Sequence, residues 1–127
     1  MAQRILIVED EPAIAEAVEY ALKAEGFEVE AVDNGNTALE QARDRAYDLL
    51  VLDLMLPGLS GVEVCRRIKR NNPGQRMMIC SAAILPNHED ALTAIGVAHF
   101  LTKPYHPEDL IAHIAREIGP RARPAWA

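Results

Sequence analysis

The sequence predicts an α/β fold in which five parallel strands form one sheet, in the order 2-1-3-4-5, with helices on both faces. The chain contains five apolar, strand-like runs, and each interval between them has room for one helix. The central runs are continuously apolar, as in strands covered on both faces. Because crossovers are right-handed, helices on both faces need a reversal of direction, and this order supplies it most simply. The runs begin near Arg4, Glu28, Asp48, Met77 and Ala98.

Helix signals fill the first three intervals. Pro12 suits the first turn of a helix, and Gly26 ends that helix. A second helix follows the polar turn at residues 34–36. Ser60 and Glu63 fit a capping box at the start of the third helix, in which each residue would satisfy a backbone N–H near the other.

The last two helices are predicted at residues 87–95 and from Pro107 onward. The fourth is the shorter and carries the weaker apolar pattern. Two prolines in residues 120–127 oppose a helical continuation. We therefore expect one domain over residues 1–119 and a flexible C-terminal tail over residues 120–127.

Composition limits the class of protein. The chain has 127 residues, and its 50% hydrophobic and 25% charged content is typical of a soluble domain. It lacks both an apolar run of roughly 20 residues and a signal-peptide core, so we expect a cytosolic protein. A net charge of -6 argues against direct binding to nucleic acid. Cys65 and Cys80 form no CxxC pair and are expected to be buried, reduced thiols.

Polar side chains stand where four of the apolar runs stop. Because ligands of parallel sheets bind beyond the carboxyl ends of the strands, we expect these groups to meet. Acidic, hydroxyl and ammonium groups together suggest a divalent cation and a phosphoryl group. The groups are Glu9 and Asp10 after the first run, Asp53 after the third, Ser81 after the fourth and Lys103 after the fifth.

The acidic side chains of Glu9, Asp10 and Asp53 indicate a metal site. Two like charges about 4 Å apart repel by roughly 4 kcal/mol at an effective dielectric constant near 20. Protonation or a bound cation usually offsets that repulsion. Oxygen ligands select a hard ion, and Mg²⁺ is the predicted cofactor, with Mn²⁺ as a substitute. A solvated acidic rim without metal is the alternative that these three residues alone leave open.

Asp53 ends the most apolar run, residues 49–52, where a carboxylate brings little unless it has a function. It can attack phosphorus and form an aspartyl phosphate. The sharp turn after it leaves the Met55 carbonyl free as a further metal ligand. The Lys103 ammonium can pair with Asp53 first and with the phosphoryl group afterwards. The Ser81 hydroxyl can donate to a phosphoryl oxygen, although alone it also suits a turn cap.

At these residues the chain resembles the response-regulator receiver domain of two-component signalling, from about Arg4 to Ile118. Each motif is weak alone, but the set in this order is specific. The resemblance implies a flavodoxin-like (βα)5 sheet, whose 2-1-3-4-5 order is also that of a chemotaxis protein of this family. The matching motifs are Glu9-Asp10, Asp53-Leu54-Met55-Leu56-Pro57-Gly58, Gly61, Ser81-Ala82 and Phe100-Leu101-Thr102-Lys103-Pro104.

The resemblance implies a phosphorylation-dependent switch that promotes its own phosphorylation and dephosphorylation but is not otherwise an enzyme. Asp53 would accept the phosphoryl group from a sensor histidine kinase or a histidine phosphotransfer protein. Mg²⁺ would be bound by Asp10, Asp53 and the Met55 carbonyl, with Glu9 acting directly or through water.

The resemblance also implies how the signal leaves the site. Ser81 and Lys103 would contact the phosphoryl group, and Phe100 matches the aromatic residue that turns inward when the hydroxyl residue moves. The face made by the fourth helix, fifth strand and fifth helix would then change its affinity for a downstream protein.

One departure from the DNA-binding subfamily concerns residues 91–100, which are nearly uncharged. That subfamily carries interlocking charges there and uses them to dimerise. We therefore expect a monomer or weak dimer, with an apolar docking face for another protein. The chain would be a stand-alone receiver or the receiver part of a longer protein, and would not itself bind nucleic acid or membrane.

Three other classes compete with this interpretation. An aspartate-nucleophile phosphohydrolase needs an acid–base aspartate two residues after the nucleophile, and Met55 stands there. A flavodoxin-like cofactor binder needs a phosphate-cradling first loop, which the acidic residues 9–11 would oppose. A degenerate receiver that only binds proteins has no need of the complete set of acids, hydroxyl and lysine.

Two further groups of residues have simpler interpretations. Among the four histidines, His106 and His113 could share a face of the last helix, but no cysteine or carboxylate cluster completes a metal site. The basic residues of the third helix are interpreted as a solvated face. They are Arg66, Arg67, Lys69 and Arg70.

Overall fold

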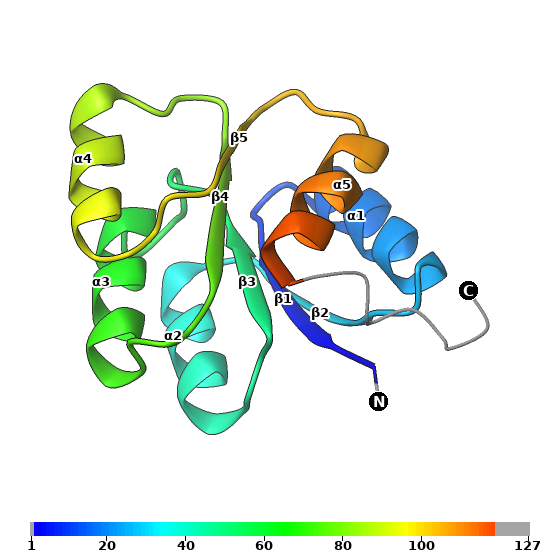
Figure 1. The fold of residues 1–127 in the computed structure, drawn as a ribbon, viewed down its shortest axis with the longest axis horizontal. Helices are drawn as coiled ribbons and strands as arrows, with labels where there is room; N and C mark the ends of the chain where they lie inside the picture. The colour runs from blue at the N-terminus through cyan, green and yellow to red at the C-terminus, as the bar shows by residue number, and fades with distance from the viewer. Residues whose placement is uncertain (1, 119–127) are drawn as a thin grey trace.

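The computed structural model describes residues 2–118, which form one five-stranded parallel sheet with five helices (Figure 1). The strand order is β2-β1-β3-β4-β5, so the predicted fold class and order are confirmed. The strands are β1 (Arg4–Val8), β2 (Glu28–Val32), β3 (Leu49–Leu52), β4 (Met77–Ser81) and β5 (Phe100–Thr102). The helices are α1 (Pro12–Ala24), α2 (Gly35–Asp44), α3 (Gly61–Asn71), α4 (Pro86–Ala94) and α5 (Pro107–Ile118). The predicted tail, residues 120–127, lies outside the described residues.

The helices cover both faces of the sheet. Helices α1 and α5 lie together on one face, and α2, α3 and α4 lie on the other (Figure 1). Side chains of a strand alternate between faces, so β1 supplies both cores. Ile5 and Ile7 pack with α1 and α5, whereas Leu6 and Val8 pack with α2, α3 and α4. This two-sided burial explains why the strands read as continuous apolar runs.

The helix starts follow the predicted signals. Asn34 accepts a hydrogen bond from the backbone N–H of Thr37 at 2.8 Å and caps α2. The Ser60 hydroxyl accepts one from the Glu63 N–H at 3.3 Å and caps α3. The Glu63 carboxylate pairs with the arginines of the same helix instead of completing the capping box. Its partners are Arg66, at 2.7 Å, and Arg67, at 2.8 Å.

Three further features concern the backbone after β5, the two cysteines and the length of the helices. The Lys103–Pro104 peptide bond, just after β5, is cis. Cys65 and Cys80 are buried and free, as predicted, and burial raises the pKa of each thiol to about 12. Among residues 2–118, no helix is both long and apolar enough to cross a membrane.

Candidate functional site

The parallel register brings the predicted polar groups to one edge of the sheet. Val8 of β1 pairs with Leu52 of β3, so the residues that follow them, Glu9 and Asp53, emerge side by side. The Asp53 N–H donates to the Val8 carbonyl at 3.2 Å. At the other edge of β4, the Lys103 N–H donates to the carbonyl of Ser81 at 3.0 Å. The order of the strands therefore places all four strand ends around one point.

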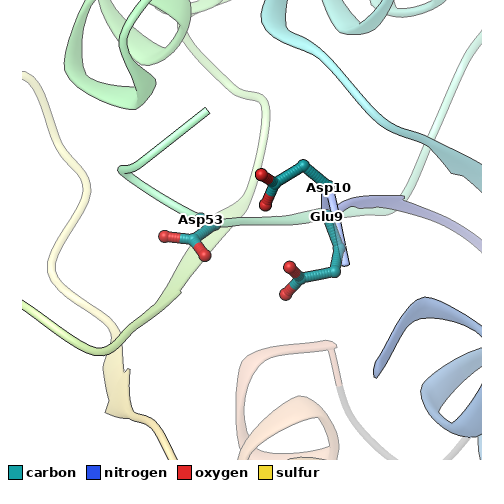
Figure 2. Close-up of side chains that lie close together, drawn as sticks. All are labelled: Glu9, Asp10 and Asp53. Carbon is teal, nitrogen blue, oxygen red and sulfur yellow. The ribbon is translucent and has the colours of Figure 1, made fainter. Parts of the chain in front are cut away.

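Three carboxylates form the acidic part of the site. Glu9 and Asp53 are buried, whereas Asp10 is exposed. One ligand atom from each lies within 4.8 Å of the others, and Figure 2 shows the three groups around a common space. Within residues 2–118, these three are the only group of three or more acidic, histidine or cysteine side chains arranged in this way.

Both oxygens of Asp53 already have hydrogen-bond donors. Oδ1 accepts from the Ser81 hydroxyl at 2.8 Å and from the Met55 backbone N–H at 2.9 Å. Oδ2 accepts from the Lys103 ammonium at 2.8 Å. Ser81 is 0% exposed, so its hydroxyl has little access to water as a partner. These donors hold the carboxylate in one orientation.

Lys103 also joins Asp53 to the neighbouring acid. Its ammonium donates to Glu9 Oε1, and Glu9 Oε2 accepts from the Glu11 N–H at 3.2 Å. The Lys103 side chain is only 9% exposed. Burial opposes its charge, but the hydrogen bonds to Asp53 and Glu9 outweigh burial and raise the pKa of Lys103. One ammonium thus offsets part of the repulsion between two buried carboxylates.

The donor set fits a hard divalent cation. The three carboxylates supply only oxygen ligands, which suits Mg²⁺ better than a soft transition metal. Asp10 is the carboxylate most open to solvent, whereas Glu9 is already held by Lys103 and the Glu11 N–H. The residues that could hold the ion are therefore Asp10 and Asp53, with Glu9 and the Met55 carbonyl as neighbours.

Two other residues predicted from sequence, Phe100 and Met55, do not add side chains to this cluster. Phe100 is half-buried and packs against the core between the sheet and α2, α3 and α4. The Met55 side chain is 63% exposed, so its backbone and not its side chain contributes to the site.

Sequence reasoning missed a histidine cluster at the start of β5. His99 Nε2 lies 2.9 Å from His113 Nδ1, and His99 Nδ1 lies 3.0 Å from a Glu117 oxygen. His113 therefore pairs with His99, although the sequence suggested His106 as its neighbour. Glu117 and His113 lie four residues apart on α5, a spacing that could have indicated this face. The contact with His99 depends on packing between β5 and α5 and has no sequence signal.

A second missed feature is an apolar groove of about 490 Å³ beside the acidic site. It lies between the start of α1 and the loop that follows β5. Its walls include Ala13, Ile14, Ala17, Pro104 and Pro107, and Lys103 borders it. The two segments are about 90 residues apart in the chain, so their apolar residues showed no common pattern.

Comparison with known proteins shows the family. The chain matches the response regulator receiver domain over residues 5–115, and it belongs to this family. It is 35% identical over 126 residues to the phosphate regulon transcriptional regulatory protein PhoB of Rhizobium meliloti, which covers 98% of this chain and 55% of that protein. It is 40% identical over 111 residues to the uncharacterized transcriptional regulatory protein YkoG of Bacillus subtilis, covering 87% and 48%. The chain therefore spans about half the length of these relatives.

Solved structures share the fold. A CheY-like response regulator receiver domain protein from Methanospirillum hungatei JF-1 has a TM-score of 0.90 and 25% identity, over 93% of this chain and 94% of that chain. The receiver domain of the sensor histidine kinase PA1611 from Pseudomonas aeruginosa PAO1 has a TM-score of 0.83 and 29% identity, over 94% and 99%. The latter structure holds a magnesium ion coordinated in its active site cleft.

Proposed function

We propose that this chain is a signalling switch in which Asp53 accepts a phosphoryl group from a histidine kinase or a histidine phosphotransfer protein. The observation that carries this proposal is the position of Asp53. It is a buried carboxylate at the end of β3, held by Ser81 and Lys103 and facing Asp10. Its neighbours supply the hydroxyl and the positive charge that a phosphoryl group attached there would need.

Mg²⁺ is the proposed cofactor, and Mn²⁺ its substitute. Asp10, Asp53 and the Met55 carbonyl would hold the ion, with Glu9 contributing directly or through water. When bound, the ion supplies charge neutralisation for the phosphoryl oxygens and orients the donor in line with the acceptor. The magnesium ion in the related PA1611 receiver domain supports this assignment.

The transfer step forms one bond and breaks one. An oxygen of Asp53 bonds to phosphorus while the bond between phosphorus and the donor's histidine nitrogen breaks. The imidazole keeps the electron pair and takes up a proton from solvent. The product is an acyl phosphate, and Lys103 then contacts a phosphoryl oxygen instead of the carboxylate. Hydrolysis of the acyl phosphate at the same site returns Asp53 to its starting state. The chain therefore promotes its own phosphorylation and dephosphorylation and does not act on a separate substrate.

The signal is proposed to leave through Ser81 and Phe100. Ser81 now donates to Asp53 Oδ1, and the modified side chain would offer its hydroxyl a phosphoryl oxygen instead. Movement of β4 at Ser81 would change the space beside Phe100, which packs in the adjoining core. The face made by α4, β5 and α5 would then alter its binding of a downstream protein.

The partners follow from this chemistry. The donor protein must bring a phosphorylated histidine to Asp53. The apolar groove beside Lys103 is the proposed docking site for that protein. Such a switch works in the cytoplasm, where kinases meet ATP. PhoB and YkoG are named as transcriptional regulators, but this chain covers only about half of each, and its net charge of -6 favours protein partners over DNA. We propose a monomer or weak dimer.

Intact mass tests the proposal. The protein is incubated with a small phosphodonor and Mg²⁺, and one phosphoryl group should be added. Asp53→Asn should abolish the addition, whereas Asp90→Asn, at an exposed position on α4, should not. A mass increase that persists in Asp53→Asn would remove this assignment. If the wild type is not modified by either a small donor or a phosphorylated histidine protein, the chain is an interaction module only.

A further inference from the structure

We propose that Gly35, the first residue of α2, is a positioning residue for the loop that carries the Met55 carbonyl. The inference rests on the proposed metal site and names a residue outside it that sets its affinity. Gly35 is buried and touches the loop between β3 and α3, residues 53–60, from the side of α2. It has no side chain to bind an ion, so its effect must act through that loop.

The contact between Gly35 and the loop leaves no room for a side chain. A Cβ at this position would lie 2.8 Å from the carbonyl oxygen of Leu59 and 2.8 Å from a methyl group of Val64. Real Cβ atoms essentially never approach that closely. The Gly35 N–H also donates to the Pro57 carbonyl at 3.5 Å. The backbone of α2 therefore lies directly against the backbone of the loop.

A second close approach joins the same two segments. Gly58 has a φ of +81°, and a Cβ there would lie 3.0 Å from the side-chain nitrogen of Asn36. Asn34, the residue before Gly35, caps α2 through the Thr37 N–H. The first turn of α2 is thus capped where it meets the loop. Only glycine on each side allows this approach, because of space at Gly35 and backbone conformation at Gly58.

Both ends of the loop are tied at nearly the same place. The Met55 N–H donates to Asp53 Oδ1, and the Gly61 N–H donates to the Leu54 carbonyl at 3.0 Å. A Cβ at residue 35 would push on Leu59 in the loop and on Val64 in α3. The part of the loop between the two tied ends, from Met55 to Ser60, is the part free to take up the displacement of Leu59. That segment contains the carbonyl proposed as a metal ligand, so pressure from residue 35 would misplace it.

The decisive variant is Gly35→Ala, compared with Gly74→Ala. At Gly74 a Cβ would meet only an oxygen of Asn72, at 3.7 Å, and the substitution should be harmless. In Gly35→Ala, the backbone amide NMR signals of residues 55–60 should shift in metal-free buffer. The Mg²⁺ dissociation constant, from an NMR titration, should rise about 10- to 100-fold, as for other changes around a metal's ligands. Urea unfolding of both variants separates this effect from lost stability.

The outcomes are distinguishable. Wild-type protein that fails to bind Mg²⁺ contradicts the proposed function itself. Wild type that binds Mg²⁺ while Gly35→Ala binds it equally well overturns the role of Gly35 and leaves the proposed function intact. If Gly35→Ala does not fold in plain buffer, sucrose is added to all samples, because an excluded osmolyte strengthens burial. Shifted loop amides and weaker Mg²⁺ binding in Gly35→Ala then support the proposal. Unchanged values overturn it, and so does a Gly35→Ala that still does not fold, because Gly35 then serves folding and not the position of the loop.

Discussion

The ammonium of Lys103 lies 2.8 Å from Asp53 Oδ2, although the two residues are 50 positions apart in the chain. The pair is buried at the ends of β3 and β5, with Glu9 as a second partner of the same ammonium. Removing one member of a buried ion pair leaves the other charge uncompensated, which typically costs about 3–5 kcal/mol. The resting arrangement therefore couples stability to the same charges that would bind a phosphoryl group.

Replacement of Lys103 by alanine should impair both stability and the response to a phosphoryl group. In Mg²⁺-free buffer, Lys103→Ala should lower the free energy of unfolding by about 3 kcal/mol, because Asp53 and Glu9 lose their counter-charge. Added Mg²⁺ should restore part of that loss. NMR with beryllofluoride, a phosphoryl mimic, should show a weaker conformational change than in wild type. Lys23→Ala, on the surface of α1, is the control, and equal activation of both variants would contradict the role of Lys103.

Asp10 should contribute to Mg²⁺ binding and not to the stability of the metal-free protein. Because Asp10 is exposed, Asp10→Asn should leave the metal-free stability unchanged or slightly higher, as one of three neighbouring negative charges disappears. Mg²⁺ at 100 times its dissociation constant should stabilise wild type by about 2.7 kcal/mol. Thermal unfolding with and without Mg²⁺ should show this gain in wild type and in Asp90→Asn but not in Asp10→Asn. An equal gain in all three would exclude Asp10 as a ligand.

Ser81→Ala should weaken the conformational change that follows phosphorylation more than it weakens phosphorylation of Asp53 itself. The buried hydroxyl donates to a charged oxygen, and such bonds contribute about 1.5–3 kcal/mol, so unfolding should be easier by about 2 kcal/mol. Phosphorylation of Asp53, measured by intact mass, should still occur. The spectral change on phosphorylation should shrink, and Ser81→Thr, which keeps the hydroxyl, should recover it. A full response in Ser81→Ala would show that the hydroxyl takes no part.

The histidine pair predicts a pH dependence of stability. Burial, then Arg116 and His99, lower the pKa of His113 below its ordinary 6.5, and Asp109 only partly opposes this. The unfolded chain therefore takes up a proton before the folded protein does. The stabilising contribution is complete above pH 6.5 and is lost as pH falls through the lower folded value.

Urea unfolding at pH 7.5 and 5.5 checks this prediction. Wild type should lose stability on acidification, and His113→Gln should lose less. His106→Gln, at an exposed position, should behave as wild type. Geometry supports the same sign, because nitrogens 2.9 Å apart can share one hydrogen but cannot both carry one between them. An identical pH dependence in wild type and His113→Gln would contradict it.

The fold and the members of the acidic site were accessible from sequence for related reasons. An apolar run such as residues 49–52 reveals a strand buried on both faces, and a polar residue after it marks the strand's end. Parallel strands bring such ends to one edge. Asp53 and Lys103 could therefore be placed together, and paired, before any distance was known, whereas the hydrogen bond from Lys103 to Glu9 could not be predicted.

The amino-acid sequence by itself determined the five strand–helix units, the cap at Ser60, and the chemistry at the strand ends. These features depend on residues that are only a few positions apart in the sequence. Only the tertiary structure decided that Lys103 holds both Glu9 and Asp53, that His99 meets His113, and that Gly35 lies against Leu59. Such contacts join distant segments, and their geometry is set by how whole helices and strands pack, to within a few tenths of an ångström.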